Sequence, residues 1–283
     1  MTTERTLLGR TKPIIGMVHV GALPGTPRAA ADLRTLAVQA AAEARDLARG
    51  GVDAVMIENM HDLPYLRREV GPEIVAAMTA VGLAVREAMD LPLGVQILAG
   101  ANRAALAVAQ ACGASFIRAE GFAYAHVADE GLMDAADAGP LLRYRRAMGA
   151  DTIAVWADVK KKHSSHAITG DLDVGEVAAG TQFMGASAVI VTGNATGHAA
   201  SVDDLAAARA ACTLPVVLGS GATPDNLAAL WPHLDAVIVG SDLKLGGDWR
   251  QPVELARVQR FIEAVNRLRC ADAGIPGATA DAT

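Results

Sequence analysis

Short runs of β-branched and other apolar residues alternate with Ala-rich amphipathic stretches along nearly the whole chain. Near-continuous apolar runs are typical of parallel strands that are buried on both faces. The stretches between them have helical spacing, among them Leu33–Arg49, Glu73–Met89, Arg103–Cys112 and Val253–Leu268. We predict eight strands, at Pro13–His19, Ala54–Glu58, Leu93–Leu98, Phe116–Glu120, Thr152–Val159, Ala188–Thr192, Pro215–Gly219 and Ala236–Gly240.

An internal repeat covers every second predicted strand. The segment that begins at Gly51 aligns with segments that begin at Gly113, Gly185 and His233. In three of the four, the glycine ends the preceding helix, as a left-handed cap requires. This repeat predicts the α/β class and a closed (β/α)8 TIM barrel. An open doubly wound sheet is the alternative, and it would have a GxGxxG motif after an early strand, which the sequence lacks.

Length and composition fit one barrel. The chain has 283 residues, and α/β barrels reach ~250 residues as one domain. We expect one domain over residues 1–270, and a disordered tail over residues 271–283, where Ala and Gly dominate without periodicity. A hydrophobic fraction of 52% and a net charge of −6 argue against disorder elsewhere and against a nucleic-acid partner.

Neither a membrane span nor a secretory signal is expected. No apolar run approaches the ~18 residues that a bilayer requires, and the first ten residues carry both charge signs. Three widely separated cysteines are typical of reduced thiols. We therefore expect a cytoplasmic protein, and Ala-rich outer helices favour a homo-oligomer.

Polar side chains gather at the carboxyl ends of the predicted strands, where such barrels hold their chemistry. Asp158 and Lys160 lie two residues apart, so alternation predicts that both face inward, and Lys162 follows if the strand continues. A lysine near other cations can act as a Schiff-base nucleophile, and a Lys–Asp pair can stabilise an enolate. The alternative is a solvated basic loop.

Two carboxylates, Glu58 and Glu120, occupy equivalent positions of the repeat. They can divide general-acid and general-base roles, or hold a divalent metal together with His19 and Asp158. Otherwise one of them forms a salt bridge with Arg118 or Lys160. No cofactor other than such a metal is indicated.

Glycine-rich loops follow the last three predicted strands. Phosphate requires converging backbone N–H donors that no Cβ obstructs, and loops after strands 7 and 8 of a barrel commonly supply them. The alternative is that these glycines merely form tight turns. The predicted phosphate-binding residues are Thr192, Gly193, Gly197, Gly219, Ser220, Gly221, Gly240 and Ser241.

The segment Gly121–Gly139 is long for a connection between a strand and a helix. Long loops over a barrel mouth often act as lids that exclude water. The predicted lid residues are Tyr124, His126 and Asp129, together with His163 after the fifth strand. A structural excursion or an oligomer contact is the alternative.

In combination, these motifs resemble the BtpA/SgcQ family over residues 13–268. The resemblance implies a phosphate-binding TIM barrel similar to the ribulose-phosphate-binding barrels. The family takes its name from a cyanobacterial protein required for photosystem I accumulation. The chain departs from other branches at Gly94–Asn102, which argues against one substrate for the whole family. The resembling segments are Ile15–Gly25, Asp53–Asn59, Phe116–Gly121, Asp129–Gly131, Ala157–His163, Val191–Gly197 and Leu218–Thr223.

These patterns predict an enzyme that acts on a small phosphorylated metabolite, such as a sugar phosphate or a nucleotide-derived ester. The expected chemistry is that of a lyase or aldolase, or of an isomerase or epimerase, at the barrel mouth. The alternatives are a metal-dependent hydrolase and a non-catalytic phosphate-ligand-binding assembly factor, the latter implied by the family resemblance.

Overall fold

The computed structural model describes residues 5–193 and 200–274. Eight parallel strands form a closed barrel in which β11 pairs with β9 and thereby completes the ring. This closure confirms the predicted barrel and excludes the open sheet. Around the ring the strands are β3 (Ile14–His19), β4 (Ala54–Glu58), β5 (Leu93–Gln96), β6 (Phe116–Ala119), β9 (Ala154–Val159), β11 (Ala188–Val191), β12 (Val216–Leu218) and β13 (Ala236–Val239).

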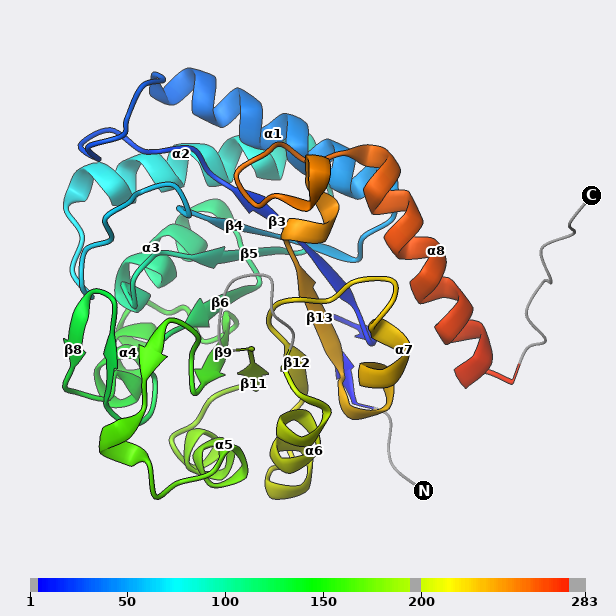
Figure 1. Ribbon diagram of the computed structural model, residues 1–283. Coiled ribbons are helices and arrows are strands. Elements are labelled where there is room, and N and C mark those ends of the chain that lie inside the picture. Colours follow the sequence, from blue (N-terminus) through cyan, green and yellow to red (C-terminus); the bar gives the residue numbers. More distant parts are fainter. Residues whose placement is uncertain (1–4, 194–199, 275–283) are drawn as a thin grey trace, which may run out of the picture.

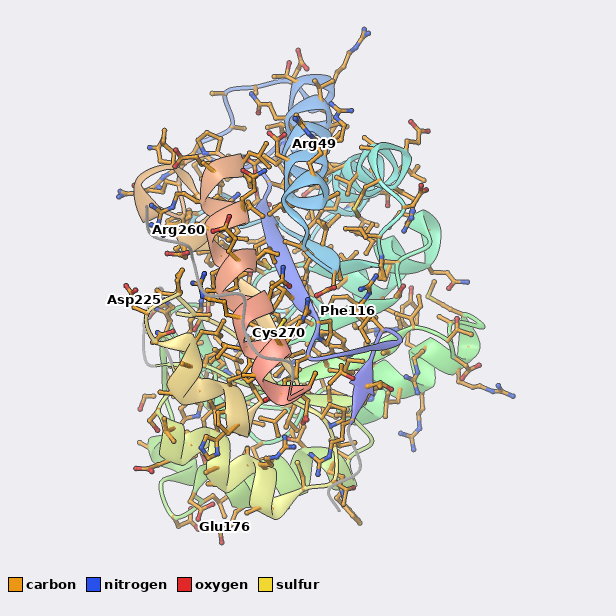
Figure 2. All side chains as sticks on the ribbon, turned by 90° about the vertical axis from the view of Figure 1, so that its right-hand side faces the viewer. Arg49, Phe116, Glu176, Asp225, Arg260 and Cys270 are labelled. Carbon is orange, nitrogen blue, oxygen red and sulfur yellow. The ribbon has the colours of Figure 1, made fainter. Side chains whose placement is uncertain are left out.

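Helices surround the barrel on its outer side (Figure 1). They are α1 (Leu33–Gly50), α2 (Pro72–Ala88), α3 (Asn102–Cys112), α4 (Ala138–Ala147), α5 (Val174–Phe183), α6 (Val202–Ala211), α7 (Leu227–Leu230) and α8 (Leu255–Asp272). Four short 3₁₀ turns are η1 (Ala167–Thr169), η2 (Trp231–His233), η3 (Ser241–Leu243) and η4 (Leu245–Gly247). Helices α1 and α8 lie side by side, with Arg49 near the end of one and Cys270 near the end of the other (Figure 2).

The observed strands agree with the predicted ones to within two residues at each end. Helix α8 continues two residues past the expected boundary, to Asp272, and the Asp272 side chain accepts hydrogen bonds from Lys12 and Trp231. Residues 275–283 of that expected tail lie outside the described residues. Among the described helices, none combines the length and the apolar character that crossing a bilayer requires.

Alternation along each strand separates two cores. On β3, Ile15 and Met17 point into the barrel, whereas Ile14 and Val18 point toward the helices. The inner core holds Phe116 stacked on Trp156, with 3.9 Å between ring centroids. The chain enters β3 from a two-stranded hairpin, β1 (Thr6–Leu7) and β2 (Arg10–Thr11), and Leu7 joins this inner core. The hairpin thus covers the N-terminal end of the barrel and leaves the opposite end as the mouth.

The internal repeat has a physical cause at the N-terminal end of the barrel. Its third position places a polar side chain where a neighbouring strand begins: Asp53 accepts from the Ile14 amide at 2.9 Å, and Asp235 accepts from the Val216 amide at 2.9 Å. Ser187 does the same for Val155. Each interaction satisfies a buried strand N–H that has no ladder partner.

An excursion between β6 and α4 forms β7 (His126–Ala128) and β8 (Gly131–Met133), a hairpin that the sequence did not reveal. It pairs antiparallel with β10 (Ser164–Ser165), which follows the lysine run after β9. The predicted lid is therefore an ordered three-stranded sheet, joined to the segment that carries the lysines.

Candidate functional site

The carboxyl ends of the strands surround a cavity of about 40 Å³ at the barrel mouth. On several strands, the last inward-facing position holds a polar side chain. The inward-facing positions closer to the start of each strand hold the apolar inner core. The lining residues are Met17, His19, Glu58, Met60, Arg118, Lys162, Gly219, Ser220, Gly221, Ile238, Gly240 and Ser241. The structure thus brings predicted phosphate-loop residues together with two predicted catalytic residues, Glu58 and His19.

The two glycine loops after β12 and β13 approach the cavity closely. A Cβ at Gly219 would lie 2.4 Å from Ile190 Cγ2, and a Cβ at Gly240 would lie 3.1 Å from His19 Nε2. Gly221 has φ +74°, a conformation that favours glycine. Within the described residues, no acceptor contacts the amide N–H groups of Gly221 and Ser241. These two donors are therefore available to an anion.

The loop after β11 is described only in part. Thr192 and Gly193 are buried, and the Thr192 hydroxyl accepts a hydrogen bond from the Lys162 amide at 3.2 Å. Neither residue is among those that line the mouth cavity. Gly197 lies outside the described residues. In this structure Thr192 fixes the backbone of the lysine run.

Glu58 and His19 form an acid–base pair on adjacent strands. His19 Nδ1 donates to the Trp249 carbonyl at 2.9 Å, so Nε2 carries the lone pair in the neutral ring and lies 3.9 Å from Glu58 Oε2. Burial, followed by the charge of Lys244, holds the pKa of His19 well below its usual range. Burial raises the pKa of Glu58. Burial thus shifts the pKa of each group in the direction that disfavours its charged form.

Arg118 and Asp158 form a buried bidentate ion pair across β6 and β9. Arg118 Nε and Nη2 lie 2.9 and 2.8 Å from the two Asp158 oxygens, and Nη1 donates to the Gly219 carbonyl at 3.4 Å. Asp158 is thus engaged by Arg118, whereas a Lys–Asp pair was expected. Arg118 thus reaches across the mouth from Asp158 to the Gly219 carbonyl. It was not predicted as a site residue, although it alternates with Phe116 and Glu120 and therefore shares their inward face.

The three consecutive lysines after β9 point in different directions. Lys160 has φ +46°, which ends the extended backbone, and its ammonium donates to the Leu172 carbonyl. Lys160 lines the smaller neighbouring cavity together with Asp158, and it does not line the mouth cavity. Lys162 takes that place, and its ammonium has no hydrogen-bond or ion-pair partner within the described part of the chain. Burial, followed by the charge of Arg118, lowers the pKa of Lys162.

Lys161 is buried in a cluster on the other side of the mouth. Its ammonium lies 3.1 Å from Glu120 Oε2 and 3.8 Å from Glu130 Oε2. The Gln96 amide donates to Glu120 Oε1 at 3.4 Å. Glu120 is therefore engaged by Lys161 and Gln96, neither of which was predicted as a site residue, and Glu58 is the carboxylate that opens into the mouth cavity.

The four proposed metal ligands are not arranged as a metal site. Asp158 is held by Arg118, and Glu120 by Lys161. Over residues 5–193 and 200–274, no group of three or more His, Cys, Asp or Glu side chains is placed to hold a metal ion. The expected alternative set of His19, Glu58, Glu120 and Asp158 is therefore not assembled.

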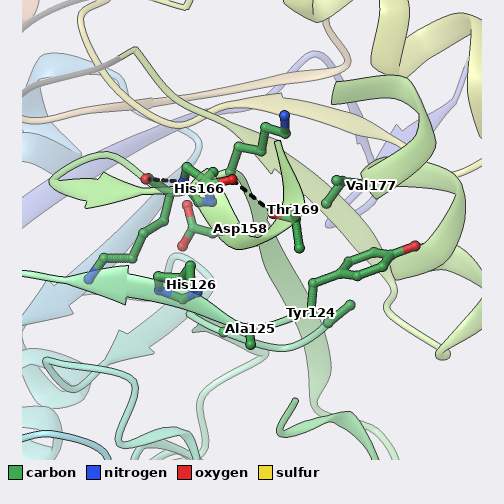
Figure 3. A pocket seen from close by; sticks show the side chains of 11 residues that line it. Tyr124, Ala125, His126, Asp158, His166, Thr169 and Val177 are labelled. Carbon is green, nitrogen blue, oxygen red and sulfur yellow. Dashed lines mark hydrogen bonds between the residues drawn. The ribbon is translucent and has the colours of Figure 1, made fainter. Parts of the chain in front are cut away.

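Two of the predicted lid residues, Tyr124 and His126, line a second, smaller cavity of about 20 Å³ beside the mouth, whereas Asp129 and His163 do not (Figure 3). Tyr124, His126 and Asp158 line it, and His166 Nε2 donates to the Lys161 carbonyl at 3.0 Å. Burial, followed by the charge of Lys161, lowers the pKa of His126 to about 4. On the outer side, His163 Nδ1 lies 3.8 Å from Asp129. These contacts join the hairpin to the lysine run.

A larger cavity of about 470 Å³ lies outside the barrel, between α1 and residues 250–253. Val18 and Val20 line it from the outward face of β3, and of the predicted site residues only His19 touches it. Polar groups from several strand ends converge on the mouth cavity, and they do not converge on the walls of this larger cavity. We therefore assign the candidate site to the mouth.

Comparison with known proteins identifies the family of this chain. The family model described as the BtpA family matches residues 10–267. The Photosystem I biogenesis protein BtpA of Synechocystis is 36% identical over 254 residues, which cover 89% of this chain and 88% of that protein. The chain belongs to the BtpA family. A second relative is an uncharacterized protein of Caenorhabditis elegans that is described as mitochondrial. It is 43% identical over 269 residues, which cover 93% of this chain and 96% of that protein.

Solved structures share the barrel of this BtpA-family chain. A (S)-3-O-geranylgeranylglyceryl phosphate synthase from Thermoplasma acidophilum has a TM-score of 0.59 at 14% identity, with 92% of this chain and 98% of that chain covered. A phosphoribosyl anthranilate isomerase from Thermus thermophilus has a TM-score of 0.53 at 16% identity, with 91% and 100% covered. At these identities the likeness concerns the fold alone.

Proposed function

We propose that this protein is an enzyme that acts on a small phosphorylated metabolite at the barrel mouth. The observation that carries the proposal is one cavity that joins glycine-loop amides and a lysine ammonium, none of which has a partner among residues 5–193 and 200–274, with a buried carboxyl group. The names of two structural neighbours, a glyceryl phosphate synthase and a phosphoribosyl anthranilate isomerase, include phosphorylated compounds and are consistent with it.

The phosphate would lie between the loops that follow β12 and β13. The amides of Gly221 and Ser241 supply N–H donors, and the close approach of Gly240 to His19 leaves no room for a side chain there. Lys162 supplies a positive charge that no protein carboxylate within the described residues neutralises at ion-pair distance. A phosphate dianion satisfies both requirements, because it accepts several hydrogen bonds and carries two negative charges.

The reaction we propose is proton transfer at a carbon next to a carbonyl group, which is the common step of isomerases, epimerases and aldolases. Glu58 is the base, because burial raises its pKa and a carboxylate of raised pKa takes a proton more readily near neutral pH. Neutral His19 can pass the proton between substrate atoms through Nε2. Lys162 stabilises the enolate oxygen, or it condenses with the carbonyl to an imine and releases water.

Phosphate binding tests the first half of the proposal. Titration of the protein with inorganic phosphate, followed by ³¹P NMR, is expected to show saturable binding that Lys162→Ala weakens and Lys160→Ala leaves unchanged. The two variants make a matched pair, because the lysines are two residues apart and only Lys162 lines the cavity. Equal weakening by both variants would contradict the placement of the phosphate.

Chemistry is tested with a panel of phosphorylated aldehydes and ketones in D₂O. We expect exchange of a carbon-bound proton, seen by ¹H NMR, and its loss in Glu58→Gln. Borohydride reduction in the same mixtures separates the two routes: an imine would be trapped as a secondary amine on Lys162, whereas an enolate route leaves Lys162 unmodified. Absence of exchange across the panel, with phosphate still bound, would refute the catalytic half.

A non-catalytic function is the second candidate, because a 36% identical relative is named as a photosystem I biogenesis protein. In that case the barrel would bind a phosphorylated ligand and serve assembly of another protein. Glu58→Gln separates the two candidates in a cellular assay, and Lys162→Ala, which weakens phosphate binding in both cases, is the control. A catalytic role requires Glu58, whereas a binding role tolerates Glu58→Gln and depends on the glycine loops.

We propose a cytoplasmic protein that forms a homo-oligomer, and fractionation and light scattering test these two statements. The mitochondrial description of the Caenorhabditis elegans relative belongs to that protein.

A further inference from the structure

Within the part of the chain that the structure describes, three buried polar atoms around the Lys161 cluster have no hydrogen-bond partner. They are Gln96 Oε1, His126 Nε2 and Glu130 Oε2. Gln96 is 1% exposed, His126 is 4% exposed, and the Glu130 side chain is 8% exposed. A buried polar atom without a hydrogen bond destabilises the fold, so three such atoms in one region indicate that a bound group satisfies them in the working protein.

The three atoms belong to one connected group, although they come from different elements. Gln96 contacts Glu120, Glu120 contacts Lys161, and Lys161 lies 3.8 Å from Glu130. His126 lines the same small cavity as Lys161 (Figure 3). The group thus reaches from the end of β5, through the loop after β9, to the β7–β8 hairpin.

This group lies across the mouth from the glycine loops. In the ring order β12, β13, β3, β4, β5, β6, β9, β11, the pair β5 and β6 is diametrically opposite the pair β12 and β13. Gln96 ends β5, and Glu120 directly follows β6. Glu58, Arg118 and Lys162 lie between the two sides. A molecule whose phosphate is held at the glycine loops would extend past these residues toward the unsatisfied atoms.

We infer that the Gln96–His126–Glu130 side of the mouth binds the hydroxyl groups of a polyhydroxylated phosphate ester, which deepens the proposed function by naming its substrate class. A hydroxyl group donates one hydrogen bond and accepts others. It can therefore donate to Gln96 Oε1 or Glu130 Oε2, and it can donate to His126 Nε2 or accept from it. Burial keeps His126 uncharged, which leaves one of its ring nitrogens as an acceptor.

The small volume beside the hairpin shapes this inference. About 20 Å³ accommodates one water-sized group, so one hydroxyl group or one water molecule fits without movement, and a longer chain of hydroxyl groups requires the mouth cavity as well. A water molecule is the competing occupant. It satisfies the same atoms but gives no preference for hydroxylated ligands.

The experiment compares three phosphates: methyl phosphate, glycerol phosphate and ribose phosphate. Dissociation constants are measured by calorimetry for the parent protein and for Gln96→Met, which keeps the side-chain volume and removes the amide. In the parent, we expect ribose phosphate to bind about threefold to tenfold more tightly than methyl phosphate, the gain of about one net hydrogen bond. In Gln96→Met that gain shrinks or disappears, and methyl phosphate binds as before.

Two further variants complete the test. His126→Leu is expected to reduce the same gain, while Gln39→Met, an exposed change on α1, leaves all three dissociation constants unchanged. The inference is overturned if ribose phosphate and methyl phosphate bind the parent equally, which is the result for a site that holds water only. It is also overturned if the gain survives in both Gln96→Met and His126→Leu. Failure of the parent to bind any of the phosphates refutes the proposed function instead, so the two failures are distinguishable.

Discussion

Replacement of Lys161 by methionine is the perturbation whose cost follows most directly from the structure. The Lys161 ammonium lies 3.1 Å from Glu120 and 3.8 Å from Glu130, and all three side chains are at most 8% exposed. Methionine has a similar length but no charge. Lys161→Met would therefore leave two carboxylates buried without their cation.

The magnitude comes from the burial of this cluster. At an effective dielectric constant of ~20, a pair of unit charges 3.1 Å apart attracts by about 5 kcal/mol. Removal of one partner from a buried pair typically costs about 3–5 kcal/mol, because the remaining charge stays desolvated. In a domain of this size that cost lowers the melting temperature by about 6–20 °C.

Thermal unfolding followed by circular dichroism measures the effect. Arg146→Met is the matched control, because the Arg146–Asp151 pair is shorter, at 2.9 Å, but 82% and 47% exposed. Exposed pairs contribute less than about 1 kcal/mol, so this control is expected to change the melting temperature only slightly. Equal shifts for Lys161→Met and Arg146→Met would refute the reasoning that burial sets the cost.

Three further predictions concern the mouth itself. Glu58→Gln is expected to raise the melting temperature at pH 8 and to leave it unchanged below pH 4.5. Burial raises the folded pKa of Glu58, so the parent loses stability as that group ionises. A less stable variant at pH 8 would refute this. Gly219→Ala is expected to cost about 1–3 kcal/mol in urea unfolding, because the new Cβ meets Ile190 Cγ2 at 2.4 Å, whereas Gly139→Ala meets only the end of a flexible arginine and serves as the control. Gly240→Ala is expected to weaken the binding of inorganic phosphate, because the new Cβ displaces the His19 ring. The free energy of unfolding is expected to change by less than about 1 kcal/mol. Unchanged phosphate affinity, measured by ³¹P NMR, would argue that this loop does not hold the anion.

Local patterns were sufficient for the fold. Buried parallel strands must be apolar on both faces, and the helices between them must carry one apolar stripe, so the alternation predicted each strand to within two residues. The repeat was equally informative, because Asp53, Ser187 and Asp235 satisfy strand amides at equivalent places around a closed ring. The family assignment agrees with the motifs that carry the resemblance.

The direction of individual side chains beyond the strand ends was decided by the tertiary structure. Period-two alternation predicted an inward Lys160, but a left-handed backbone at that residue ends the strand, and Lys162 enters the mouth instead. The sequence likewise left open whether Glu58 or Glu120 would be engaged, since partners such as Lys161 and Arg118 are chosen by distances across the barrel. The sequence by itself determined the barrel and the end at which polar groups gather, because hydrophobic periodicity is a local property. The partner of each charge, the ordered hairpin and the unsatisfied atoms beside it depend on which loops contact one another, and only the closed fold determines those contacts.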